Sequence, residues 1–303
     1  MIHCGDSQLR RPDILNTGQF TDNSGRDANV IALYLLAAIA VIGFAADRLF
    51  FYPRRRQSDI ISQAFPDEWR KQLERDMVHY TRLPQDLRKK LEDGVLLLLD
   101  RVSFYGCNGV EVTDAMKRLI AAHGALLTCG MRTGYDSGIR TILVYPDGYR
   151  APSHTAEGMV HTTTSDARLG ESWGDGRVVL AWSTLKQEAA DPQATSNLAI
   201  HEFAHQLDTL DGQADGAPPL SSGEQARNWE AVFSESWERL KAAPTNPHNV
   251  LDPYGATNPA EFFAVATEAF FQSPQALQTH EPHLYDCLKG FYQLSPADWG
   301  KQT

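Results

Sequence analysis

Residues 201–208 read HEFAHQLD, and the interpretation of the whole chain begins with them. On a helix, His201 and His205 lie one turn apart, so both imidazoles project from the same face. This spacing suits a divalent metal that takes nitrogen ligands at about 2.0–2.1 Å, above all zinc. Glu202 lies about 100° round the helix, where it can take a proton from a water molecule that the metal has made acidic. The pattern H-E-x-x-H therefore predicts a zinc site together with its general base.

The alternative is a chance match on an ordinary amphipathic helix. With the His and Glu frequencies of this chain, roughly one or two random chains in a hundred would contain the pattern. The surroundings favour a helix with buried faces, because several positions around the motif are apolar: Leu198, Ile200, Ala204 and Leu207. Asp191-Pro192 or Thr195-Ser196 can begin such a helix.

A catalytic zinc site needs three protein ligands, and the motif supplies two. No histidine follows at the spacing HExxHxxGxxH, which excludes the three-histidine class of site. The best candidate for the third ligand is Glu261, 56 residues after His205, in the first turn of a helix that Asn258-Pro259 can begin. Glu268 lies on the same face seven residues later. It can brace a ligating histidine, or it is an ordinary surface acid.

Two further side chains lie close to these residues in the sequence. Asp208 comes one turn after His205 and can accept a histidine N–H, or lie at the surface as a helix-terminal acid. Tyr254 precedes Glu261 by seven residues, in the loop that leads into that helix. A phenol near a metal can donate a hydrogen bond to the oxyanion of a tetrahedral intermediate; the alternative is a packed loop tyrosine.

Composition limits the class of protein. The chain has 303 residues and a net charge of −10, which argues against a direct nucleic-acid binder held by phosphate contacts. Its four cysteines show no paired spacing that would indicate a zinc knuckle or a disulfide framework: Cys4, Cys107, Cys129 and Cys287. Three of them lie in the expected globular part, so at least one is unpaired there, which favours a reducing compartment.

The N-terminal part reads as a tail followed by a membrane span. Residues 1–29 are polar, and we expect them to be disordered. Val30 to Ala46 is a run of seventeen residues without a charge. A helix of this length covers about 25 Å, somewhat less than a hydrocarbon core of about 30 Å. Apolar residues then continue to Tyr52, an aromatic suited to the membrane interface. We expect a single span over residues 30–52; the alternatives are a buried core helix and a signal peptide.

Basic residues around the run predict its orientation. Arg48 and Arg54–Arg56 lie just after it, whereas only Arg26 lies close before it. The positive-inside rule then places the C-terminal part in the cytoplasm. Arg10 and Arg11 reduce this asymmetry, and a soluble cytoplasmic protein is the alternative.

The rest of the chain predicts one domain over residues 60–299. Helical patterns cover residues 66–80, 84–102, 114–127, 224–240, 258–272 and most of the remainder. Two short runs rich in β-branched and aromatic residues, TILVYP (141–146) and RVVLAW (177–182), predict buried strands. Residues 147–176, rich in Gly, Ser, Thr and His, predict a long irregular segment.

Several of these motifs together resemble one family. HEFAHQLDTLDG (201–212), GAPPL (216–220) and YGATNPAEFFAVATEAFF (254–271) look like the Mlc titration factor A family. These are zinc-dependent peptidases with a catalytic core similar to that of the lethal-factor metalloproteases. The likeness extends upstream to FPDEWRKQL, TILVYP and GESWGDGRVVLAW, and so covers about residues 60–295.

The resemblance implies roles for particular residues. It implies that Glu261 is the third ligand and that Tyr254 is the tyrosine that accompanies it. It also implies that His161, in a Val-His pair before GESW, is a further and inhibitory metal ligand from a mobile loop; a solvent-exposed loop histidine is the alternative. Gly255 stands where relatives carry Ala. The membrane span lies outside the family core, so localisation does not follow from the resemblance.

We therefore expect an α+β, zincin-like domain, helix-rich with a small mixed sheet, preceded by a single N-terminal transmembrane helix. One Zn2+ per chain would lie between the helices of His201 and Glu261, and the enzyme would hydrolyse peptide bonds as a gluzincin-type peptidase. The resemblance suggests aminopeptidase-like activity. The rival prediction is a membrane-tethered protein that sequesters a transcriptional repressor, because the family resembles a titrating partner of such a repressor.

Overall fold

The computed structural model describes residues 24–131, 138–147, 170–173, 176–246 and 248–299. The chain divides into two compact units, residues 1–56 and 57–303.

The N-terminal unit is helical. Helix α1 (Ser24–Ala46) continues through a π-helical turn, η1 (Asp47–Phe51), into α2 (Tyr52–Ile61). The helix thus begins inside the segment expected to be disordered and extends beyond residue 52. Its large apolar side chains from Leu33 to Tyr52 are exposed. Among the described residues this is the one helix that is long and apolar enough to cross a membrane, judged by length and composition alone.

A four-stranded sheet forms one part of the second unit. Its strands are β1 (Ser103–Gly106), β2 (Thr141–Tyr145), β3 (Gly170–Trp173) and β4 (Arg177–Ala181), in the order β1-β2-β4-β3. The first three in that order are parallel, and β3 pairs antiparallel with β4. Strands β2 and β4 match the two predicted runs. Strands β1 and β3 were not predicted, because SFYG and GESW are too short to show an apolar pattern.

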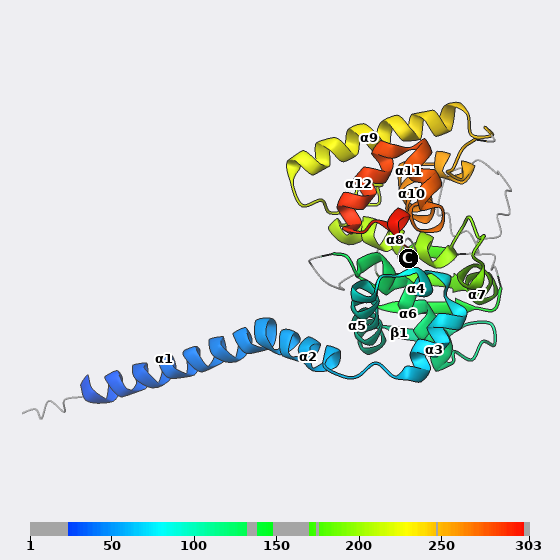
Figure 1. Cartoon of the computed structure of the whole chain (residues 1–303). Coiled ribbons are helices and arrows are strands. Elements are labelled where there is room, and N and C mark those ends of the chain that lie inside the picture. Colours follow the sequence, from blue (N-terminus) through cyan, green and yellow to red (C-terminus); the bar gives the residue numbers. More distant parts are fainter. Residues whose placement is uncertain (1–23, 132–137, 148–169, 174–175, 247, 300–303) are drawn as a thin grey trace, which may run out of the picture. The chain divides into compact units, whose positions relative to one another are not determined.

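Six helices belong to the same part of the unit as the sheet (Figure 1): α3 (Asp67–Asp76), α4 (Val78–Arg82), α5 (Gln85–Arg101), α6 (Asp114–Thr128), α7 (Trp182–Ala190) and α8 (Leu198–Asp208). The helix predicted over residues 66–80 is broken at Met77, which has an extended backbone and a fully buried side chain. Helix α7 was not predicted. Helix α6 begins where expected, since the Thr113 hydroxyl accepts the N–H of Met116 at 3.3 Å.

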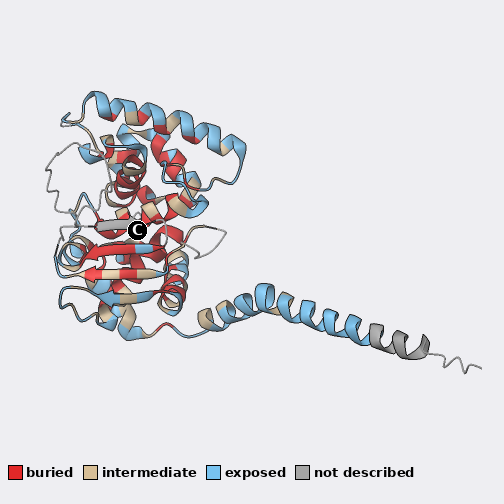
Figure 2. Ribbon diagram, turned by 180° about the vertical axis from the view of Figure 1, so that it is seen from behind, coloured by how far each residue is buried: buried red, intermediate tan, exposed pale blue. Residues whose placement is uncertain are grey.

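The remaining helices pack on the far side of α8 (Figure 1): the 3₁₀ turn η2 (Thr209–Asp211), α9 (Gly223–Ala242), η3 (Pro253–Ala256), α10 (Pro259–Gln272), α11 (Pro274–His280), α12 (Pro282–Tyr292) and η4 (Pro296–Asp298). Helix α8 contacts α6, β3 and β4 on one side and α10 on the other. One continuous core joins both sides, and Figure 2 shows the buried residues in red along the facing elements. The expected helix-rich fold with a small mixed sheet is confirmed, and α8 lies at its centre.

Candidate metal centre

Helix α8 carries the HEFAH motif, and its own sequence decides which face is buried. The Asn197 side chain accepts the N–H of Ile200 at 3.0 Å and caps the helix. The predicted starts at Asp191-Pro192 and Thr195-Ser196 were therefore a few residues too early. Apolar side chains fill the buried faces: Leu198, Ile200, Phe203, Ala204 and Leu207. The side chains of His201 and His205 share the remaining face and are 14% and 15% exposed.

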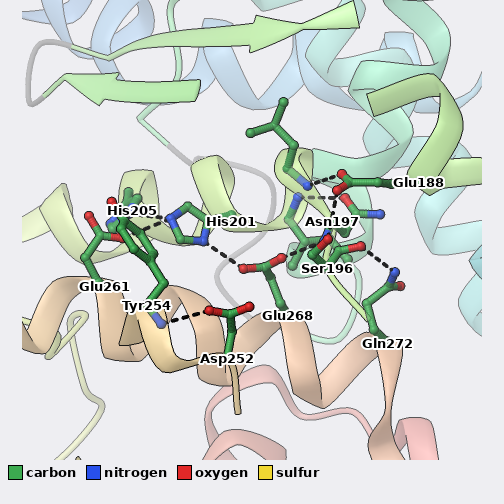
Figure 3. Close-up of polar contacts among 12 residues, drawn as sticks. Glu188, Ser196, Asn197, His201, His205, Asp252, Tyr254, Glu261, Glu268 and Gln272 are labelled. Carbon is green, nitrogen blue, oxygen red and sulfur yellow. Dashed lines mark hydrogen bonds and ion pairs between the residues drawn. The ribbon is translucent and has the colours of Figure 1, made fainter. Parts of the chain in front are cut away.

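A second helix brings the third side chain to this face. Asn258 caps α10, because its Oδ1 accepts the N–H of Glu261 at 3.0 Å, and Pro259 occupies the first helical position. Glu261 thus lies in the first turn of α10, as expected. Its side chain is 18% exposed and faces both imidazoles (Figure 3).

The three side chains form a close triangle. Nε2 of His201 lies 3.0 Å from Oε2 of Glu261 and 3.1 Å from Nε2 of His205, and the third side, from His205 Nε2 to Glu261 Oε2, is 3.3 Å. Ligands at about 2.0–2.1 Å from a tetrahedral zinc ion are separated by about 3.3–3.4 Å. The triangle therefore needs only small adjustments to hold such an ion, and two imidazole nitrogens with one carboxylate oxygen are donors that zinc accepts.

Glu268 orients His201 from behind. Its Oε1 lies 2.8 Å from Nδ1 of His201, and its Oε2 accepts the N–H of Asn197 at 2.6 Å (Figure 3). Because an ionised carboxylate only accepts, Nδ1 of His201 carries a proton, and Nε2 is the nitrogen that faces the triangle and would bind a metal ion there. Of the two possibilities left open by the sequence, Glu268 is the brace and not an ordinary surface acid.

Glu188 supports the same helix start, and sequence reasoning missed it. Its Oε2 accepts the N–H of Leu198 and its Oε1 accepts the hydroxyl of Ser196, at 2.6 and 2.8 Å. Gln272 donates to the carbonyl of Ser196 at 2.9 Å. Acids at the first turn of a helix bind its free N–H groups. Glu188 comes from α7, so no local pattern could have revealed this contact.

The triangle has the electrostatics of a cation site. Burial lowers the pKa of His201, but its contacts with Glu261 and Glu268 outweigh this effect and raise the pKa to about 10. Burial raises the pKa of Glu261, yet the hydrogen bonds from His201 and His205 prevail and hold the pKa well below its usual range. The shift of His201 indicates that the acids favour a positive charge at the triangle, which either protons or a metal ion can supply, and the shift of Glu261 indicates that its carboxylate stays ionised there.

Glu202 and Tyr254 lie beside the triangle. Glu202 follows His201 on α8, is only 4% exposed, and contributes to raising the pKa of that histidine through its charge. Tyr254 lies in η3, where its N–H donates to Asp252 at 2.8 Å. Its ring centroid is 6.1 Å from that of His201, and the residue is 54% exposed. It is therefore a solvent-facing residue at the edge of the site and not a packed loop tyrosine.

The sequence also named His161 and Asp208. His161 lies outside the described residues. Asp208 is fully buried, and its Oδ2 accepts the N–H of Gly216 at 3.0 Å. Burial raises the pKa of Asp208 to about 6, although the hydrogen bond from Gly216 opposes the change. Among the described contacts, Asp208 thus holds the loop after α8 and does not brace a histidine.

Known proteins resemble the chain over most of its length. The family described as glucose-regulated metallo-peptidase M90 matches residues 51–293. An uncharacterized protein of Synechocystis sp. is 36% identical over 244 residues, or 80% of this chain and 89% of the relative. Mlc titration factor A of Pectobacterium atrosepticum is 34% identical over 191 residues, or 61% of this chain and 71% of that protein. The protein of the same name from Yersinia pestis is 30% identical over 205 residues, covering 66% and 74%.

Proposed function

Since the chain belongs to the glucose-regulated metallo-peptidase M90 family, we propose that it is a zinc-dependent peptidase with one zinc ion per chain. The observation that carries this proposal is the triangle of His201, His205 and Glu261, with sides of 3.0, 3.1 and 3.3 Å. These three side chains would hold the ion. Zinc bound there would polarise the carbonyl of a peptide bond and make a water molecule acidic.

The neighbouring residues have separate roles in this proposal. Glu202 accepts a proton from the attacking water and later delivers it to the leaving amine, as a general base and then a general acid. Tyr254 donates a hydrogen bond to the oxyanion of the tetrahedral intermediate. Glu268 keeps the Nε2 lone pair of His201 directed at the metal.

The substrates are peptides, and the family resemblance favours aminopeptidase-like cleavage of short ones. His161 stays a proposed further ligand that inhibits the site, and this rests on the resemblance alone. A panel of aminoacyl and internally quenched peptides separates the two modes of cleavage. Release of single N-terminal residues supports the proposal, and internal cleavage alone contradicts it.

Glu202→Gln tests the assigned base. The variant should bind zinc with the wild-type stoichiometry while its turnover falls about a hundredfold or more. Glu224→Gln, an exposed change on α9, is the matched control and should leave both unchanged. Unaltered turnover in Glu202→Gln would remove this residue from the mechanism.

The relatives' name supports a second candidate function. Two of them are called Mlc titration factor A, which fits a protein that sequesters a transcriptional repressor. Binding of a repressor to the Glu202→Gln protein, in the absence of cleavage, would favour this function. Failure of the Glu202→Gln protein to bind a repressor would favour the peptidase instead.

We further propose that residues 30–52 anchor the protein in a membrane, with the peptidase domain in the cytoplasm. The exposed apolar helix and the arginines that follow it support this, as do the free thiols of Cys107, Cys129 and Cys287. The full chain should stay in the membrane fraction after alkaline carbonate washing, and a chain lacking residues 1–56 should not. Recovery of the full chain in the soluble fraction would support the soluble alternative.

A further inference from the structure

The loop between α8 and α9 makes an unusually close backbone contact with the first residue of α10. Gly216 has a φ of +79°, and a Cβ placed on it would lie 2.3 Å from the carbonyl oxygen of Pro259 and 2.7 Å from its carbonyl carbon. Both are backbone atoms, so they cannot rotate away as a side chain would. Only glycine permits both this conformation and this approach.

Two hydrogen bonds connect Gly216, a loop residue, to helices α8 and α9. Its N–H donates to Oδ2 of Asp208 on α8, and its carbonyl accepts the indole N–H of Trp229 on α9, both at 3.0 Å. Asp208 is fully buried and Trp229 is 3% exposed. Trp229 in turn stacks on Phe233, with ring centroids 3.9 Å apart. Leaving a buried polar group without its hydrogen-bond partner costs free energy of folding. Movement of Gly216 would break these two hydrogen bonds, so its position is tightly restrained.

These contacts connect the two helices that carry the triangle. Asp208 lies three residues after His205 on α8, and Pro259 lies two residues before Glu261 on α10. The path from Asp208 through Gly216 to Pro259 thus fixes the start of α10 relative to the end of α8. The first turn of α10, which contains Glu261, is the part of that helix nearest the contact.

We propose that Asp208 and Gly216 are positioning residues that set the distance of Glu261 from the two histidines, and through it the affinity for zinc. The inference rests on the proposed function, because it assumes that the triangle binds zinc. Neither residue belongs to the triangle, so their effect on zinc is transmitted through the backbone of Pro259. Contacts one step removed from metal ligands typically change metal affinity by about 10- to 100-fold.

Gly216→Ala tests this inference, and Gly212→Ala is its matched control. Gly212 lies in the same loop with a φ of +90°, but a Cβ there would meet nothing within 4 Å. Both variants therefore introduce alanine at a position with left-handed backbone conformation, but only the Cβ of Gly216→Ala would clash with the backbone of Pro259. The full chain is titrated with zinc in competition with a chromogenic chelator. The Gly216→Ala variant should bind zinc at least about tenfold more weakly than the wild type. Gly212→Ala should stay within about twofold of the wild type.

A second pair keeps the test decisive if Gly216→Ala does not fold. Asp208→Ala removes the acceptor of the Gly216 N–H, whereas Asp208→Asn keeps an oxygen that can accept it. Zinc affinity should fall at least about tenfold in Asp208→Ala and be largely restored in Asp208→Asn. Equal affinities in the alanine and asparagine variants would overturn the inference.

A double-mutant cycle separates positioning from general destabilisation. With Glu261→Ala in the background, Gly216→Ala should weaken residual zinc binding by less than about twofold, because the ligand that it displaces is already gone. An undiminished effect in that background would overturn the inference while leaving the proposed function intact. A wild-type chain that binds no zinc would instead overturn both.

Discussion

At the scale of single residues, the site depends on carboxylates that accept hydrogen bonds from the backbone and, in one case, also contact an imidazole. Glu188 and Glu268 both bind N–H groups at the start of α8, and only Glu268 also contacts His201. This difference separates support of the helix from orientation of a proposed metal ligand.

Replacing Glu268 by glutamine should therefore weaken zinc binding. His201 and Asn197 contact different oxygens of Glu268, and glutamine replaces one of these oxygens by an NH2 group that cannot accept, so one contact is lost together with the charge that strengthens both. We expect zinc affinity to fall at least about tenfold. Glu188→Gln is the control: it loses contacts to the same helix start but should keep zinc affinity. Isothermal titration of both variants measures this, and equal losses would show that Glu268 acts only on the helix.

Two buried histidines away from the site should make the fold sensitive to acid. Burial lowers the pKa of His79 to about 3 and that of His123 to about 4, from an ordinary value of 6.5. As the pH falls below about 6.5, these histidines become protonated in the unfolded chain but stay neutral in the folded protein, so stability is lost until the pH reaches the folded pKa. Above about pH 6.5 the histidines are neutral in both states, and their contribution to stability is constant.

His123→Gln should thus flatten the stability curve between pH 6 and pH 4, by up to about 1.4 kcal/mol per pH unit. The exposed His283→Gln on α12 is the control and should leave the slope unchanged. Urea unfolding at each pH gives the slopes. Parallel curves for the wild type and His123→Gln would contradict a neutral, buried His123.

At the scale of elements, the cap of α10 fixes both the helix and the ligand that it carries. Asn258 accepts the N–H of Glu261 itself, whereas Ser222 caps α9 by accepting the N–H of Gln225, which is not part of the triangle. The two caps have similar geometry, but only the cap of α10 holds the backbone of a residue in the triangle.

Asn258→Ala and Ser222→Ala should each lower the free energy of unfolding by about 1 kcal/mol. Only Asn258→Ala should also weaken zinc binding, because it frees the backbone at Glu261. Chemical denaturation combined with zinc titration distinguishes the two effects. Equal zinc affinities in both variants would show that the core around α10 holds Glu261 without its cap.

At the scale of the whole domain, the triangle joins two helices that pack on each other across the core. An ion held by α8 and α10 would bind the folded state and not the unfolded chain, so it would stabilise the domain. At a zinc concentration a thousand times the Kd this amounts to about 4 kcal/mol, or roughly 10 °C in Tm for a domain of this size.

Removal of zinc with a chelator should lower the Tm by roughly 10 °C, and adding zinc again should restore it. His205→Ala should show the low Tm with or without zinc. Differential scanning calorimetry of the chain lacking residues 1–56 avoids interference from the apolar helix. A Tm that does not respond to zinc in the wild type would contradict the metal site.

Local sequence determined much of this protein. The four-residue spacing places His201 and His205 on one face of any helix, and Asn258-Pro259 begins α10 wherever that helix packs. Helices α5, α6, α9 and α10 and strands β2 and β4 were predictable, because each carries its own apolar pattern or cap. The family motifs indicated the same residues.

Other features required the tertiary structure. The strands β1 and β3 are four residues long and are stabilised by pairing with neighbours that come later in the chain. The break at Met77 follows from burial of its side chain, and the partners of Asp208 and Glu188 lie in segments that no periodicity connects. A side chain's distance from residues far along the chain depends on how the helices pack. For this reason the sequence could nominate Glu261, whereas only the folded domain brings its carboxylate within 3.0 Å of His201.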